Sequence, residues 1–303
     1  MLFSIFDDPA AFLRSLLILL PGAMLSTGLH ESAHGLIAEK CGDPTARYAG
    51  RITLNPVKHF DLFGFLCMFF IGFGWAKPVP VNPLLFKNWR RDDIKVALAG
   101  ITANLLLALV CFLVLTTVFN CALAGMPVVD NYMDILNMEK DTPFLLNMHG
   151  DEKVFFFSTS EGSIGADNLF RFSFGRYYYI GTAGDLTVYN SVIEPAFGPI
   201  VSILYEMITR CMYLNIALAV FNLIPLPPLD GYHVLNDLVL KQDLFAQQKT
   251  VRIASGILVA LILIGNYRPE WDIISIGING VATFFTNIFA VASQWIAGVF
   301  GVI

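Results

Sequence analysis

Charged residues are scarce in this chain. Only 14% of its 303 residues are Asp, Glu, Lys or Arg, while 56% are hydrophobic. A soluble domain carries about 25% charged residues, because charges cover its surface. Several long apolar runs accompany the deficit, so the sequence predicts an integral membrane protein. The net charge is −5 and no dense basic patch occurs, which argues against a nucleic-acid partner.

Paired cysteines and a leader are lacking as well. The five cysteines are scattered, mostly in apolar stretches, and no CxxC occurs. This spacing predicts buried thiols and excludes a disulfide framework or a zinc knuckle. The first eight residues hold two aspartates and no basic residue, which is not the form of a cleaved signal peptide. The first apolar segment is therefore expected to stay as a structural helix.

That first apolar segment predicts one long helix. Asp8 is a suitable N-cap and Pro9 suits the first helical position, and the apolar pattern runs to about Glu39. At about 1.5 Å per residue, a helix of this length crosses a bilayer. Pro21 and Gly22 predict a kink within it.

The next apolar stretch, residues 60–76, differs from an ordinary span. It is short, three glycines interrupt it, and prolines bound it on both sides. Irregular backbone at membrane depth needs protein or water around it, so a re-entrant or β-hairpin loop packed against other helices is predicted.

Four further apolar runs, residues 94–123, 200–223, 251–264 and 274–303, predict the remaining spans. The predicted fold class is an all-α polytopic membrane protein with a three-helix core and about two C-terminal helices. Residues 126–194 are the one section of soluble character. Their aromatic-rich segments, separated by glycines, predict a small β-meander, and an ordered loop without activity is an equal alternative.

The distribution of basic residues predicts the orientation. Lys and Arg concentrate in the connections at residues 42–91 and 226–252, whereas residues 126–194 are rich in acid. Because cytoplasmic loops carry an excess of Lys and Arg, both basic connections are expected in the cytoplasm. The β-rich insertion and the N-terminus are then expected outside.

The first helix contains an HExxH motif, His30-Glu31-Ser32-Ala33-His34. Two histidines four residues apart stand on one helical face and can share a metal ion. The glutamate between them can take a proton from a water molecule that the metal activates. An isolated intramembrane histidine is also compatible with a satisfied polar group in a bundle. Three ionisable residues in one spanning segment favour function, because they are costly in hydrocarbon.

A catalytic zinc site takes three protein ligands, so a third must come from elsewhere. The remaining histidines are His59, His149 and His233, and intramembrane carboxylates are few. Asp230 stands in the segment NLIPLPPLDG, residues 222–231, where the third helix breaks near the predicted cytoplasmic face. His30 and His34 are expected at a similar depth, which makes Asp230 the foremost candidate.

These two motifs resemble those of the site-2 proteases, the intramembrane zinc metalloproteases of peptidase family M50. Residues 74–79, GWAKPV, are similar to the family's segment between its first two core helices. Residues 99–104, AGITAN, are similar to the family's AGPxxN stretch, with Ile101 where proline is usual. The likeness covers about residues 12–120 and 205–240 and leaves out the 126–194 section.

The resemblance implies one zinc ion per chain with His30, His34 and Asp230 as ligands, and Glu31 as the general base. It also implies that Asn104 and Asn222 hold or orient the substrate backbone. Hydrogen bonds between helices are an equal alternative for both asparagines. His233 is expected either behind the metal ligands as a hydrogen-bond partner or as an ordinary loop histidine.

The chain is expected to divide into four parts. Residues 1–125 form the first half of the membrane protease core, with the HExxH helix, the re-entrant loop and the second helix. Residues 126–194 are the external β-rich insertion, 195–245 the third core helix with the LDG motif, and 246–303 the C-terminal transmembrane helices.

The predicted function is hydrolysis of peptide bonds in membrane-protein substrates by a zinc-activated water. An intramembrane metal transporter and an inactive protease-like scaffold are the alternatives. A metal conduit has no need of the glutamate in HExxH, and a scaffold has no need of a complete set of ligands. The expected partners are a transmembrane protein or peptide and the lipid bilayer, in a prokaryotic plasma membrane with the site toward the cytoplasm.

Overall fold

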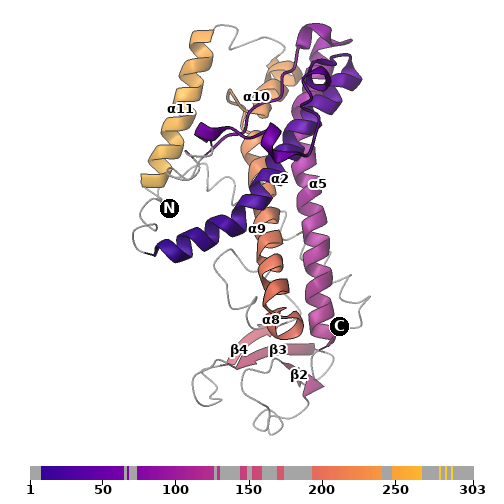
Figure 1. Ribbon diagram of the computed structural model, residues 1–303, viewed down its shortest axis with the longest axis vertical. Helices are drawn as coiled ribbons and strands as arrows, with labels where there is room; N and C mark the ends of the chain where they lie inside the picture. The colour runs from indigo at the N-terminus through magenta and orange to yellow at the C-terminus, as the bar shows by residue number, and fades with distance from the viewer. Residues whose placement is uncertain are drawn as a thin grey trace. The chain divides into compact units, whose positions relative to one another are not determined.

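Long helices dominate the computed structural model of the chain (Figure 1). The structure describes residues 8–64, 67, 74–125, 128–129, 144–148, 152–158, 169–173, 193–240 and 248–267, and the single positions 280, 284 and 288. Two compact units divide it. The first joins Met1–Leu109 with Cys211–Phe284, and the second joins Val110–Arg210 with Phe285–Ile303. All the predicted site residues within the described ranges belong to the first unit.

The helix α2, Pro9–Cys41, carries the HExxH motif. The Asp8 carboxylate accepts hydrogen bonds from the backbone N–H groups of Ala10 and Ala11 at 3.1 and 2.9 Å, which confirms the predicted N-cap. The helix ends at Gly42, whose φ of 114° lies in the left-handed region that glycine adopts at low cost. Pro21 lies inside α2, and the helix is bent along its length (Figure 1).

The second long helix, α5, spans Trp89–Ala124 and begins earlier than predicted. The apolar run that predicted this helix begins at residue 94, so the charged cluster at residues 90–93 was taken to precede the helix, but it lies in the first turn. The Asp92 carboxylate accepts from the Asn88 N–H at 2.9 Å, one of the donors that a helix start leaves unpaired. It also pairs with the Lys95 ammonium at 2.7 Å.

The third long helix, α9, spans Pro199–Asn222 and follows the short helix α8, Glu194–Phe197. Within the described ranges, α2, α5 and α9 are the three helices long and apolar enough to cross a membrane. They confirm the integral membrane class. The helix α11, Gln248–Tyr267, has a shorter apolar part, and the predicted last span lies almost wholly outside the described residues.

Close contacts join α2 to α9 within the first unit. A side chain at Gly22 would come within 3.0 Å of Cys211 Cβ, so the two backbones approach closely there. One turn later, the amide of Asn215 donates to Ser26 Oγ at 2.7 Å. Small residues and short polar bonds of this kind are what hold helices together in lipid.

The connection between α2 and α5 is a loop anchored on α2. It contains α3, Thr45–Tyr48, and the single turns η1, Pro56–Lys58, and η2, Pro83–Leu85, and residues 65–66 and 68–73 lie outside the described part. Ser32 Oγ donates to the Thr53 carbonyl at 2.6 Å. Ala38 and Cys41 of α2 pack with Phe86 and Val96 in a buried apolar cluster. The described part of this loop contains no strand.

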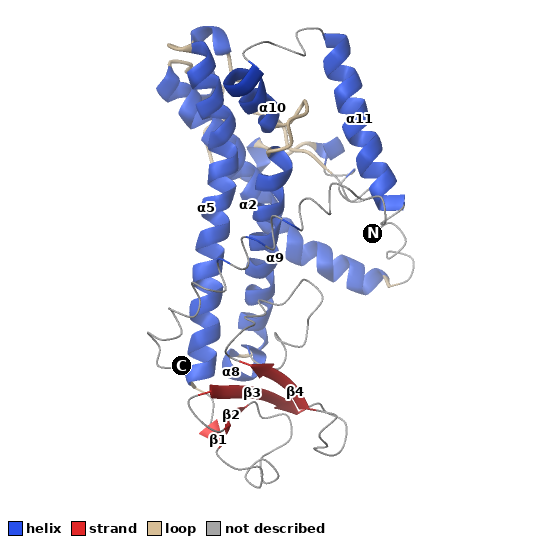
Figure 2. Cartoon of the chain, turned by 180° about the vertical axis from the view of Figure 1, so that it is seen from behind, coloured by secondary structure: helices blue, strands red, loops and turns tan. Residues whose placement is uncertain are grey.

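The section between α5 and α9 contains a small sheet in the second unit (Figure 2). Its order is β1 (Val128–Val129), β2 (Phe144–Met148), β3 (Glu152–Ser158) and β4 (Leu169–Ser173). The first pair is parallel and the other two are antiparallel. Three aromatic-rich segments of this section, residues 154–157, 169–174 and 177–180, were expected as strands, and the first two overlap β3 and β4. The third, residues 177–180, lies outside the described residues, and the external position of the section stays a prediction.

A sharp break separates α9 from the short helix α10, Asp230–Val234, which continues as a π-helix, η5, over Leu235–Leu240. Three prolines stand in this break, and proline cannot continue a helix. The break places Asp230 at the start of a new helix near the end of α9.

Candidate metal centre

The two motif histidines face the same point from α2. His30 and His34 are both about nine-tenths buried, and their Nε2 atoms lie 3.0 Å apart. Their rings meet edge to face with centroids 4.6 Å apart. The four-residue spacing therefore puts both rings on one face of α2, with their Nε2 atoms directed to the same point.

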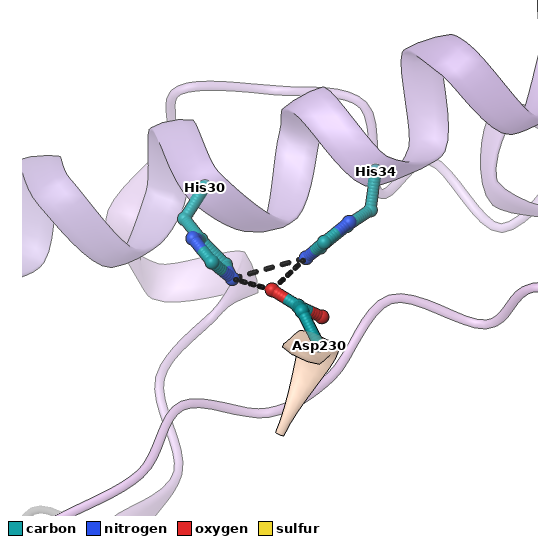
Figure 3. Close-up of side chains that lie close together, drawn as sticks. All are labelled: His30, His34 and Asp230. Atoms are coloured by element: carbon teal, nitrogen blue, oxygen red, sulfur yellow. Dashed lines mark hydrogen bonds and ion pairs between the residues drawn. The ribbon is translucent and has the colours of Figure 1, made fainter. Parts of the chain in front are cut away.

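Asp230 meets this pair from α10. Its Oδ2 atom lies 3.3 Å from His30 Nε2 and 3.4 Å from His34 Nε2, and the three side chains point toward one another (Figure 3). Among the described residues, this is the group of His, Cys, Asp and Glu side chains whose ligand atoms converge closely enough for a metal ion. Burial raises the pKa of Asp230, but the two imidazoles beside the carboxylate outweigh it and lower the pKa overall. The carboxylate is therefore ionised.

The spacing of these atoms fits zinc. Ligands at about 2.0–2.1 Å in a tetrahedron lie about 3.3–3.4 Å from one another. The observed separations are 3.0, 3.3 and 3.4 Å. Asp230 Oδ2 is buried and no hydrogen bond in good geometry meets it, so it needs a positive partner. Two imidazoles and one carboxylate form a donor set that catalytic zinc accepts, with a fourth position open.

The helix α5 forms the wall behind the histidines. His34 Nδ1 donates to the Val96 carbonyl at 2.7 Å, which leaves the Nε2 lone pair free. A Cβ at Gly100 would lie 2.5 Å from His30 Cε1 and 2.6 Å from His34 Nε2, so any side chain there displaces the pair. Asn104 is fully buried, and its amide nitrogen lies 3.2 Å from His30 Nδ1. Residues 96, 100 and 104 thus contact the pair from consecutive turns.

Glu31 lies on another side of α2. It is half-buried, and its Oε2 accepts the Val79 backbone N–H at 2.7 Å. Ser32 of the same motif bonds to both backbone groups of Thr53, as donor to its carbonyl and acceptor from its N–H. The motif therefore binds the flanking loop as well as presenting the histidines.

Among the described residues, no recorded contact joins Asn222 to His30, His34 or Asp230. Its amide nitrogen donates to the Leu218 carbonyl of its own helix at 2.9 Å. The two sequence-based alternatives for Asn222 both stay predictions.

The other histidines lie apart from the converging group. His233 Nδ1 lies 2.8 Å from Asp93 Oδ2, and this hydrogen bond raises the pKa of His233. It therefore ties α10 to α5. His59 is buried with Nε2 2.8 Å from the Thr53 carbonyl, and His149 lies outside the described residues.

The sequence analysis did not predict several contacts of the centre. They are the Val96 carbonyl, the space left by Gly100 and the Asp93–His233 pair. The AGITAN stretch was noticed, and the four-residue spacing of Gly100 and Asn104 was the available signal that both face the same neighbour.

Close packing against the end of α9 explains why the LDG motif has a glycine, Gly231. A Cβ at this position would overlap the carbonyl groups of Leu223 and Ile224 at the end of α9. We expect Gly231→Ala to push α10 outward with Asp230 and to weaken zinc binding about 10–100-fold. Chelator competition on the purified protein measures this. Gly256→Ala is the control, because open space surrounds Gly256, and equal affinity of the two variants would contradict the argument.

Membrane-spanning helices with a buried His–His–Asp group define a membrane protein with a candidate metal centre. The profile of peptidase family M50 matches residues 18–265. A Bacillus subtilis (strain 168) protein named "Putative zinc metalloprotease YwhC" is 30% identical over 270 residues, which cover 88% of this chain and 90% of that protein. No solved structure matches the chain.

The chain therefore belongs to peptidase family M50, the site-2 protease family. This membership confirms the resemblance seen in the motifs. It makes the protein a membrane-embedded metalloprotease, and it implies zinc as the metal.

Proposed function

We propose that this metalloprotease hydrolyses peptide bonds of membrane-protein substrates within or beside the bilayer. Zinc is held by His30, His34 and Asp230, and Glu31 is the general base. The supporting observation is that three ligand atoms converge from α2 and α10, while α2 is itself long and apolar enough to cross a membrane. A centre built on such a helix operates at bilayer depth, where the available peptide bonds are those of membrane proteins.

Neighbouring groups orient the proposed ligand side chains. When bound, zinc supplies Lewis acidity, which polarises the scissile carbonyl and makes a water molecule more acidic. The Val96 carbonyl keeps the proton of His34 on Nδ1, and so turns Nε2 toward the centre. The ionised Asp230 contributes a negative charge that compensates the positive charge of the metal.

Glu31 has the surroundings that a general base needs. One carboxylate oxygen is fixed by the Val79 N–H at 2.7 Å. The structure records no hydrogen bond from a described residue to the other oxygen, which is left to accept a proton. The proton that Glu31 accepts stays on its carboxylate until the peptide bond breaks. It can be returned to the amine that leaves when the peptide bond breaks.

The location proposed is a prokaryotic plasma membrane with the centre toward the cytoplasm. Support comes from the exposed basic residues Lys87, Arg90 and Arg91, which stand where α5 begins, and from Lys40 in the last turn of α2. Labelling of single cysteines introduced at residues 48 and 87 with a membrane-impermeant maleimide tests this. Labelling only after the membrane is opened supports the orientation, and labelling of intact cells contradicts it.

The zinc content of the purified protein tests the ligand assignment. We expect about one zinc per chain in the wild type and in Glu31→Gln, and a large loss in Asp230→Ala, which removes one of three ligands. The measurement is metal analysis after purification in detergent. A wild type that holds no zinc, even when zinc is supplied, would refute the proposed function. Full zinc retention in Asp230→Ala would refute only the third ligand.

A further inference from the structure

Asn104 is a buried polar residue to which the proposed chemistry assigns no role. It has no exposed surface, and its side-chain oxygen is buried without a hydrogen-bond partner among the described residues. Its amide nitrogen lies 3.2 Å from His30 Nδ1. A buried oxygen without a hydrogen bond is unfavourable, so the arrangement calls for a reason.

The reason is the tautomer of His30, that is, which of its two ring nitrogens carries the proton. His30 Nε2 faces Asp230 Oδ2 at 3.3 Å and is the atom that would bind zinc. A neutral imidazole that binds metal through Nε2 carries its proton on Nδ1. The Nδ1–H group therefore needs an acceptor, and an amide nitrogen is not one.

Rotation of the Asn104 amide by about 180° resolves both problems. The oxygen and nitrogen of an asparagine amide exchange places in such a rotation, and the shape of the side chain hardly changes. The oxygen then accepts from His30 Nδ1–H across the 3.2 Å separation, so it is no longer unpaired. The nitrogen moves to the place of the former oxygen.

We propose that Asn104 is a positioning residue that holds the His30 imidazole in the zinc-binding tautomer through its side-chain oxygen. This inference rests on the proposed function, because it takes His30 to be a ligand. Asn104 contacts the ring at Nδ1, away from the Nε2 atom that faces Asp230. It acts through His30 and does not bind the substrate backbone.

The arrangement around His34 supports this role. There the Val96 carbonyl accepts from Nδ1 at 2.7 Å, so each histidine has one neighbour on α5 at the same ring atom. The two neighbours stand two turns apart, and Gly100 between them leaves room for both rings. One helix thus orients both histidines, by a backbone carbonyl at one and by a side-chain amide at the other.

The test compares two substitutions that keep the number of side-chain heavy atoms. Asn104→Leu removes the acceptor and Asn104→Asp keeps it. In the full chain purified in detergent, we expect Asn104→Leu to weaken zinc binding about 10–100-fold and Asn104→Asp to stay within about threefold of wild type. Chelator competition measures the affinities. The visible spectrum of the cobalt-loaded protein gives a second readout, because it changes when a ligand ring turns.

Asn215→Leu is the matched control. Asn215 is also fully buried, but its amide donates to Ser26 Oγ on α2 and to the Cys211 carbonyl of its own helix. Its loss is expected to lower thermal stability without changing zinc affinity. Should Asn104→Leu fail to fold, Asn104→Ala repeats the comparison with a smaller side chain.

Wild-type affinity in Asn104→Leu or Asn104→Ala would overturn the inference, and so would equal losses in Asn104→Leu and Asn215→Leu. Either result leaves the proposed function intact as long as the wild type binds zinc and Asp230→Ala does not. A wild type that binds no zinc would instead refute the proposed function itself.

Discussion

Replacing Glu31 with glutamine is expected to lower kcat about 10²–10⁴-fold, the usual contribution of a general base. Glutamine has the same shape, and its oxygen can still accept the Val79 N–H that now meets Oε2 at 2.7 Å. The amide nitrogen then occupies the place of the second carboxylate oxygen, and it cannot take a proton. Turnover of any membrane protein that the wild type cleaves measures the effect.

Glu39→Gln is the control for this substitution. Glu39 stands two turns further along α2, where its carboxylate pairs with Arg47 outside the metal centre. We expect Glu39→Gln to keep kcat within about twofold of wild type, because exposed ion pairs contribute little. Wild-type turnover in Glu31→Gln with full zinc content would exclude Glu31 as the base.

Gly100→Ala is expected to weaken zinc binding at least about 100-fold while the helices remain folded. The added methyl carbon would lie 2.5 Å from His30 Cε1 and 2.6 Å from His34 Nε2, closer than non-bonded atoms allow. Alanine fits the α5 backbone well, so the histidine rings must move. Once they turn away, their Nε2 atoms no longer converge with Asp230.

Chelator competition and thermal unfolding together test this prediction. Gly256→Ala is again the control, since it places the same methyl group on a helix with open space around it. Zinc affinity should fall in Gly100→Ala and stay unchanged in Gly256→Ala. Wild-type affinity in Gly100→Ala would mean that the histidine rings of the metal-bound protein lie away from α5.

The sequence predicted those parts of the centre that depend on local geometry. The i, i+4 spacing of His30 and His34 determines that they share a face of any α-helix, and the N-cap at Asp8 marks where that helix begins. Asp230 was predicted from a motif at the end of an apolar segment, and the structure brings it to the histidines. That these three bind zinc stays a proposal.

The contacts made by α5 could not be predicted in the same way. Whether Val96, Gly100 and Asn104 face the histidines depends on how α5 is rotated about its axis, and its apolar residues run almost all round the helix. In lipid such a pattern does not identify the buried face, because the surroundings are as apolar as the core. The start of α5 was also misplaced, since a cluster of charges was taken as a boundary.

The third candidate ligand comes from a segment that the ribosome makes long after the first two. Translation proceeds at about 5–20 residues per second, so Asp230 follows His34 by on the order of ten seconds or more. During that interval α2 and α5 can enter the membrane, but the histidine pair lacks its carboxylate partner. With the ligands proposed above, a newly made chain completes its metal centre only when α9 and α10 are in place.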